Sequence, residues 1–234
     1  MKRILITGAN RGIGLELTKQ YLVQGNFIYA CCRDINRANE LQSLQLQYKG
    51  RIEILSLDVE DEVSVKSCFD ELERNQKCID LLFNNAGIID WSKLDEVTSS
   101  SVEQVYKINL LGALLVTRNA VSCLQRSTSP LIINLSSRLG SIHLRGDTQL
   151  GGAIAYQCSK AALNMLTRQT SFDLKPFNIR VISQSPGWVK TEMGGQEAKY
   201  QVEEAVSMML HALEKLPHDK TGIFIGEDGE PIPW

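Results

Sequence analysis

Short apolar segments alternate with longer amphipathic segments along the whole 234-residue chain. The apolar segments are rich in Ile, Leu and Val and alternate only weakly, as strands buried on both faces of a sheet do. Strands that alternate with helices predict right-handed β-α-β crossovers and a parallel sheet. The pattern therefore predicts an α/β fold, a single-domain doubly wound parallel sheet of about seven strands with helices on both faces.

The expected elements follow from this periodicity. We expect strands at 4–7, 27–31, 52–56, 79–83, 131–135, 179–182 and 223–225, and helices at about 12–24, 35–48, 61–75, 100–125, 156–175 and 201–216. Ser100 and Glu103 have the spacing of a capping box for the fourth helix. Because no repeat, low-complexity segment or linker interrupts the series, residues 1–234 are expected to form one domain.

Composition excludes several classes of protein. A net charge of -2 offers no basic surface for nucleic acid or an anionic membrane, and no apolar run approaches the roughly 20 residues of a membrane span. The three histidines share no metal-ligand spacing, so we expect no metal site. The N-terminal segment lacks the pattern of a signal peptide, and the six cysteines, without a C-x-x-C motif, are expected to be reduced, mostly buried thiols. These features predict a cytoplasmic protein.

A glycine-rich segment, TGANRGIG at Thr7–Gly14, follows the first expected strand and opens the first expected helix. Glycines permit a tight turn and a close backbone approach, and a helix N-terminus favours a phosphate. The spacing is Gly-x-x-x-Gly-x-Gly, and a glycine turn without a ligand is the alternative. We predict that this loop binds the phosphates of a dinucleotide, with Gly8, Asn10, Arg11, Gly12, Ile13 and Gly14 as the candidate residues.

The ends of the second and third strands carry the residues that choose between cofactors. An acidic side chain after the second strand favours NAD, whereas an arginine favours the extra phosphate of NADP, and this chain has both Arg33 and Asp34. Arg11 adds a second cation, so we predict NADP(H), with Asp34 interpreted as a helix cap. After the third strand, Asp58 and Val59 are candidates for the adenine, although Asp58 is equally suited to cap the next helix.

Five motifs together point to one family. In chain order they are TGANRGIG (7–14), NNAG (84–87), IINLSS (132–137), YQCSK (156–160) and PGWVKT (186–191). In this order and spacing the chain resembles the short-chain dehydrogenase/reductase family along nearly its whole length. Within that family it is similar to the sniffer and C-factor-type carbonyl reductases, through the segments 186–195 and 228–234. The resemblance implies a Rossmann fold and a nicotinamide cofactor.

By this resemblance the catalytic residues are Asn109, Ser137, Tyr156 and Lys160. Tyr156 would donate the proton to the substrate oxygen. Lys160 lies one helical turn further on the same face, and its cation is expected to lower the tyrosine pKa below its usual value near ~10. Asn109, in the middle of a long helix, would hold a water of a proton relay. A solvated Tyr–Lys helix face and a partly buried asparagine bonded to the backbone are the alternatives.

Two adjacent serines compete for the third catalytic position. Ser136 and Ser137 point to opposite faces of a strand, so only one can serve. The family pattern selects Ser137, whose hydroxyl would hold the substrate oxygen beside Tyr156. Ser136 is expected to be packed or bonded to the backbone, and an offset strand register would exchange the two.

The resemblance assigns further residues to the cofactor. A strand that ends in small residues lets the backbone pass close to a ligand, and a Pro-Gly turn follows the sixth strand. Val189 would bond the carboxamide, while Thr191 would contact the nicotinamide or phosphate end. The full set of these candidates is Asn85, Ala86, Gly87, Tyr156, Lys160, Pro186, Gly187, Val189 and Thr191.

Two stretches are expected to choose the substrate. One is the insert 139–155, which contains His143, Arg145, Asp147, Gly151 and Gly152, and the other is the short lid 192–200. A short lid predicts an open site that tolerates many small carbonyl compounds. Trp188 is either a pocket wall or simply packed.

Three functions remain in competition at this stage. The first is an NADPH-dependent carbonyl reductase, the second a nucleotide-binding signalling or sensor protein of the C-factor type, and the third an NAD-dependent alcohol dehydrogenase. The family also implies a homo-oligomer, dimer or tetramer, that pairs the helices 100–125 and 156–175.

Overall fold

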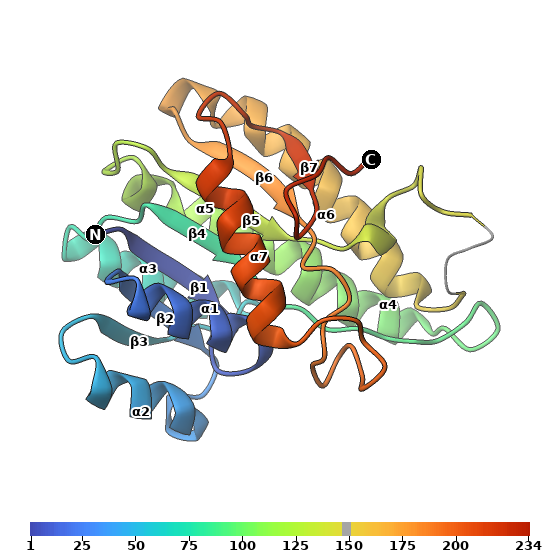
Figure 1. The fold of residues 1–234 in the computed structure, drawn as a ribbon, viewed down its shortest axis with the longest axis horizontal. Coiled ribbons are helices and arrows are strands. Elements are labelled where there is room, and N and C mark those ends of the chain that lie inside the picture. Colours follow the sequence, from blue (N-terminus) through green and yellow to red (C-terminus); the bar gives the residue numbers. More distant parts are fainter. Residues whose placement is uncertain (147–150) are drawn as a thin grey trace.

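A computed structural model describes residues 1–146 and 151–234 of the chain. Its centre is a seven-stranded, fully parallel sheet with the strand order β3-β2-β1-β4-β5-β6-β7 (Figure 1). The predicted α/β, doubly wound Rossmann fold is therefore confirmed. The strands are β1 (Arg3–Thr7), β2 (Phe27–Cys32), β3 (Ile52–Ser56), β4 (Leu81–Asn84), β5 (Leu131–Leu135), β6 (Arg180–Gln184) and β7 (Ile223–Ile225).

Helices cover both faces of the sheet (Figure 1). On one face lie α1 (Gly12–Val23), α2 (Asn39–Gln47) and α7 (Val202–Lys215). The other face is covered by α3 (Glu62–Arg74), by α4 (Ser99–Tyr106) with the π-helix η2 (Lys107–Gly112) and α5 (Ala113–Leu124), and by α6 (Ile154–Asp173). Within the described ranges, no helix is long and apolar enough to cross a membrane.

The sheet is buried on both sides, which explains the weak alternation in the sequence. In β1, Leu5 faces the core under α3 and α5, while Ile4 and Ile6 face the core under α1 and α7. All three are fully buried, so this strand places apolar side chains in both cores. Five of the six cysteines are also buried as free thiols, and Cys158 is exposed.

Several expected boundaries shift for local reasons. The expected helix 35–48 is a 3-10 turn, η1 (Ile35–Arg37), followed by α2, because Asp34 accepts a hydrogen bond from the Asn36 amide and starts a tighter turn. The capping box of α4 is formed by Thr98 and Ser101, each bonding the other's backbone amide, so the expected pair Ser100 and Glu103 is wrong.

The polar residues collect at one edge of the sheet because every strand runs in the same direction. The carboxyl ends of β1 to β6 all open there, and the chain order reverses between β1 and β4. Ligands of open α/β sheets bind in the crevice at this reversal. The expected glycine loop and the NNAG segment lie on its two sides.

Gly14 fixes how closely helix α1 approaches the strand ends. A Cβ added there would lie 2.3 Å from the Gly8 carbonyl oxygen and 2.6 Å from Asn85 Nδ2. We predict that Gly14→Ala lowers the free energy of unfolding by about 2 kcal/mol through this clash, although alanine is the better helix former. Urea unfolding followed by circular dichroism measures the change.

Gly151→Ala is the matched control, since a Cβ there meets nothing within 4 Å. Its free energy of unfolding should stay within about 0.5 kcal/mol of the wild type. Equal stability of the Gly14 variant and the wild type would contradict the proposed close approach.

Candidate active site

Tyr156 and Ser137 meet at the carboxyl edge of the sheet. Tyr156 lies in the first turn of α6, and Ser137 follows the end of β5. The Ser137 hydroxyl lies near enough to the phenol to lower its pKa, and the Ser137 oxygen accepts the Leu139 amide at 3.1 Å. The hydroxyl oxygens of Tyr156 and Ser137, which come from a helix and from the end of a strand, thus lie close together at one place. A substrate oxygen can be held there.

Ser136 faces away from this point. Its hydroxyl donates to Asn164 Oδ1 at 2.7 Å in a buried contact, and Asn164 in turn donates to the Gly140 carbonyl. Ser136 is thus packed, as one of the two expectations had it, and its hydrogen-bond partner is a side chain rather than the backbone. Of the two serines, only Ser137 contacts Tyr156.

Burial controls the titration of Tyr156 and Lys160. Removal from water raises the pKa of Tyr156 to about 12, partly offset by the nearby Ser137 hydroxyl. The expectation that Lys160 lowers this pKa is therefore wrong for this structure. Burial also lowers the pKa of Lys160 to about 8, because an ammonium group loses hydration there. The Lys160 Nζ lies 5.6 Å from the Tyr156 ring centroid and donates to the Leu135 carbonyl at 2.7 Å.

Asn109 lies in the π-helix η2, a widened turn between α4 and α5. Its Oδ1 accepts the Ile88 amide, and its Nδ2 donates to the Ile88 carbonyl and to Ser159 Oγ. A single π turn inside a helix is a frequent feature of functional sites and removes the difficulty of an asparagine in a regular helix. The sequence did not predict this turn, since its residues KINLLG read as ordinary helix.

Gly87 lies between Asn109 and Lys160. A Cβ at this position would be 3.2 Å from Asn109 Oδ1 and 3.7 Å from Lys160 Nζ. The glycine therefore keeps open the space beside both catalytic candidates. A backbone without a side chain at this place fits a ligand that lies against it.

The glycine loop is held to the end of β4 by side chains. Thr7 Oγ1 donates to the Phe83 carbonyl and accepts the amides of Asn85 and Ala86, while Asn85 Nδ2 donates to the carbonyls of Thr7 and Gly8. The amides of Asn85 and Ala86 are thus used within the protein. A contact of these two residues with a cofactor would come from their carbonyls or from Ala86 Cβ.

The loop leaves the N-terminus of α1 open. Gly8 and Gly12 have φ angles of +64° and +53°, which only glycine adopts easily. In the described chain no side chain caps α1, and its first turn has no acidic residue. Free amides and the positive end of the helix dipole therefore point out of the loop, which fits the phosphates of a dinucleotide.

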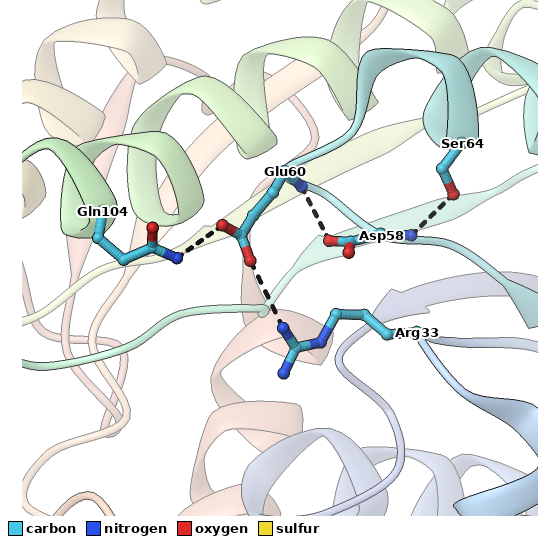
Figure 2. A network of polar contacts seen from close by, with 5 residues as sticks. All are labelled: Arg33, Asp58, Glu60, Ser64 and Gln104. Atoms are coloured by element: carbon cyan, nitrogen blue, oxygen red, sulfur yellow. Dashed lines mark hydrogen bonds and ion pairs between the residues drawn. The ribbon is translucent and has the colours of Figure 1, made fainter.

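Both cations expected at the cofactor are paired with carboxylates. Arg33 Nη1 lies 3.4 Å from Glu60 Oε2 (Figure 2), and Arg11 forms an ion pair with Glu192. The sequence analysis missed both partners. Glu60 could have been found from strand order, because in-register parallel strands β2 and β3 bring the segments that follow them together.

Asp34 and Asp58, the two aspartates of this region, make different hydrogen bonds. Asp34 caps η1, as predicted. Asp58 Oδ1 accepts the Glu60 amide at 3.1 Å, and the cap of α3 is Asp61. Asp58 is therefore not the cap of the following helix, and its carboxylate lies beside the ion pair of Arg33 (Figure 2).

The segment after β6 folds back on itself beside the glycine loop. Gly187 has a φ of +76°, and Val189 forms a bridge with Tyr200. Thr191 Oγ1 accepts the Gly194 amide, and its Cγ2 is the atom that a Cβ on Gly12 would meet at 3.6 Å. Pro186, at the start of this segment, follows directly on Ser185, which is buried.

Trp188 lies in the same segment. Its Nε1 donates to the Gly194 carbonyl, while 47% of the residue is exposed. Trp188 is therefore not simply packed in the core.

The expected substrate insert 139–155 is anchored at both ends. The His143 amide donates to the carbonyl of Trp234, and the Ala153 amide donates to the carbonyl of Trp91. Gly152 passes so close that a Cβ would lie 2.9 Å from the Trp91 oxygen. Asp147 lies outside the described residues. Across the described ranges, no group of three or more His, Cys, Asp or Glu could hold a metal ion.

Comparisons with known proteins agree with this geometry. The family model of the short chain dehydrogenases matches residues 2–201. The C-signal protein of Myxococcus xanthus is 36% identical over 157 residues, 67% of this chain and 93% of that protein. An NADPH-bound carbonyl reductase from chicken fatty liver has 35% identity and a TM-score of 0.94, covering 100% of this chain and 99% of the other. The carbonyl reductase Sniffer of D. melanogaster has 33% identity and a TM-score of 0.93 over 100% of both chains.

The lowered pKa of Lys160 predicts a pH-dependent stability. Between about pH 8 and the usual value of 10.5, the unfolded chain binds more protons at this lysine than the folded chain. The free energy of unfolding of the wild type should therefore rise with pH in this window relative to Lys160→Met, by up to about 1.4 kcal/mol per pH unit. Urea unfolding of both proteins at pH 7.5 and 9.5 measures this difference.

Lys66→Met, at an exposed lysine of α3, is the control for loss of one lysine. If the wild type and the Lys160 variant changed in parallel across this range, the buried lysine would have an ordinary pKa.

Proposed function

The chain belongs to the short-chain dehydrogenase/reductase family of oxidoreductases, and from this premise we propose that it reduces a carbonyl group to an alcohol with NADPH. The observation that carries the proposal is that Ser137 and Lys160 both lie beside the buried ring of Tyr156. The substrate class is a small aldehyde, ketone or quinone.

The proton chemistry follows from the titration of the buried groups. A pKa of about 12 keeps Tyr156 protonated at neutral pH, so it can give a proton to a carbonyl oxygen as negative charge develops there. The Ser137 hydroxyl, beside the same phenol, would stabilise that oxygen. The bound nicotinamide would supply the hydride.

Lys160 is suited to restore the proton of Tyr156. With a pKa of about 8, its ammonium group is mostly charged at pH 7. It also releases a proton more easily than the ammonium group of an exposed lysine would. Asn109 Oδ1 accepts one backbone amide, which leaves it an acceptor position for a water. We assign Asn109 the role of holding that water, through which a proton reaches Lys160.

The cofactor site is assigned to the glycine loop and the strand ends around it. The uncapped α1 amides would hold the pyrophosphate, Gly87 would face the nicotinamide end, and the 189–191 segment would complete that end. Arg33 and Arg11 would meet the 2′-phosphate of NADPH. The use of Asp34 as a cap argues against NAD, because this carboxylate is already bonded to the Asn36 amide.

A second function has an observation of its own. The similarity to the C-signal protein favours a signalling or sensor role that keeps the nucleotide site. The first measurement below separates this role from catalysis. Placement in the cytoplasm is part of the proposal for either function.

We predict that Tyr156→Phe removes carbonyl reduction and leaves NADPH binding intact, since the ring stays and only the proton donor is lost. The expected loss in kcat is at least about 100-fold. NADPH consumption with a panel of aldehydes, ketones and quinones, with NADH in parallel, measures it. If the wild type turned over none of these compounds yet bound NADPH tightly, the sensor role would stand in place of the reductase.

The serine pair supplies a matched control for the same assay. Ser137→Ala should lower kcat by about 100-fold because its hydroxyl contacts the reacting oxygen. Ser136→Ala, one residue away, should mainly affect stability through loss of its bond with Asn164. The opposite ranking of the two variants would show that Ser136 serves the site.

We also propose self-association through the α4–α5 and α6 side of the molecule. Four large apolar side chains are exposed there, namely Leu111, Leu114, Met165 and Phe172. Light scattering after gel filtration should give two or four times the mass of one chain. Met165→Glu should lower that mass, whereas Val23→Glu, at the exposed end of α1 on the other face, should not. A wild-type mass of one chain at micromolar concentration would rule this interface out.

A further inference from the structure

We propose that Glu60 is a specificity-determining residue of the cofactor site: its carboxylate partly neutralises Arg33 and lowers the affinity for the phosphate that distinguishes NADPH from NADH. The inference rests on the proposed function, in which Arg33 meets this phosphate. Glu60 itself would not touch the nicotinamide or the substrate.

The pair spans two neighbouring strand ends. Arg33 follows β2, Glu60 lies four positions after the end of β3, and the strands are in register with Cys32 opposite Ser56. Arg33 Nη1 and Glu60 Oε2 are 3.4 Å apart (Figure 2). The side chain of Arg33 is 66% exposed, whereas that of Glu60 is only 15% exposed.

The carboxylate is the anchored member of this pair. Gln104 of α4 donates from Nε2 to Glu60 Oε1 at 2.6 Å, which leaves Oε2 directed at Arg33 (Figure 2). The Glu60 amide donates to Asp58 Oδ1, and the Asp58 amide donates to Ser64 Oγ. Contacts with α4 and with the turn before α3 therefore hold a negative charge in place beside an exposed guanidinium group.

Two opposed effects of this carboxylate have to be weighed. The carboxylate orients the Arg33 side chain, but an ion pair of 3.4 Å with an exposed guanidinium group restricts that side chain only weakly. It also repels an approaching phosphate monoester, which carries a charge of about -1.5 to -2 at neutral pH. Because Glu60 is largely shielded from water, salt screens its charge less than that of a surface carboxylate. Repulsion is therefore the larger effect, and NADH, which lacks the phosphate, does not experience it.

Glu60→Gln tests the proposal with a side chain of the same shape. The new amide oxygen can accept from Arg33, and its NH2 group can donate to the Gln104 oxygen once the Gln104 amide turns over, so the variant removes the charge and keeps both contacts. Titration of tryptophan fluorescence gives Kd for NADPH and NADH. We expect the Kd for NADPH to fall about fivefold, equivalent to about 1 kcal/mol, and the Kd for NADH to stay within about twofold. The gain should shrink at higher ionic strength.

A pair of nucleotide fragments isolates the phosphate. Adenosine 2′-monophosphate and adenosine 5′-monophosphate each carry one phosphate, and only the first carries it where Arg33 would bind it. The Glu60 variant should tighten binding of the 2′-monophosphate more than that of the 5′-monophosphate. Equal effects on both fragments would overturn the proposal.

A second carboxylate near Glu60 supplies the matched control. Glu62→Gln removes the same charge two residues later, where Glu62 pairs with Arg118 at 2.6 Å on the α3–α5 side, and should leave both Kd values unchanged. An equal gain in this control would mean a general charge effect and would overturn the role of Glu60.

Arg33→Ala separates the inference from the proposed function. If this variant weakens NADPH selectively while Glu60→Gln leaves NADPH binding unchanged or weaker, the role of Glu60 is wrong and the cofactor proposal stands. If Arg33→Ala affects NADPH and NADH equally, the cofactor proposal fails and the role of Glu60 fails with it.

Discussion

The joining of the glycine loop to the end of β4 is the constraint on which the site depends. One hydroxyl, Thr7 Oγ1, takes part in three hydrogen bonds, and one amide, Asn85 Nδ2, bonds two loop carbonyls. Gly14 then allows α1 to pack against the Gly8 carbonyl. The open N-terminus of α1 and the NNAG backbone are thus fixed on the two sides of one crevice.

A buried chain of hydrogen bonds holds the surroundings of Tyr156 in a similar way. Asn84 donates to Asn134, Asn134 donates to Thr167, and Thr167 bonds Ser183, so β4, β5, α6 and β6 are linked beneath the site. Buried hydrogen bonds of this kind are costly to break and favour one arrangement of the elements. They fix α6 against β5, and with it Tyr156 against the residues that follow β5.

Different physical effects act on the ionisable groups at the two ends of the crevice. Around Tyr156, burial raises the pKa of the tyrosine and lowers that of Lys160. At the other end the cations stay exposed, and Glu60 and Glu192 pair with them. Desolvation therefore sets the pKa values of Tyr156 and Lys160, whereas ion pairing with carboxylates partly neutralises Arg11 and Arg33.

The sequence by itself determined the elements and their motifs. The periodicity of apolar residues depends on local burial, so all seven strands were predicted, with boundaries shifted by at most two residues. The glycines of the first loop and the cap at Asp34 were also predicted, because turn and cap preferences are set by a residue and its near neighbours.

Only the tertiary structure decided the remaining features. The π turn at Asn109 reads as helix in the sequence, the partners of Arg11 and Arg33 are distant along the chain, and the choice between Ser136 and Ser137 depends on strand register. The predicted direction of the Tyr156 pKa shift was wrong. Sequence spacing shows that Lys160 is near the tyrosine, but it does not show that both groups lose their contact with water. Burial and long-range pairing are properties of the packed chain, whereas spacing is a property of the sequence.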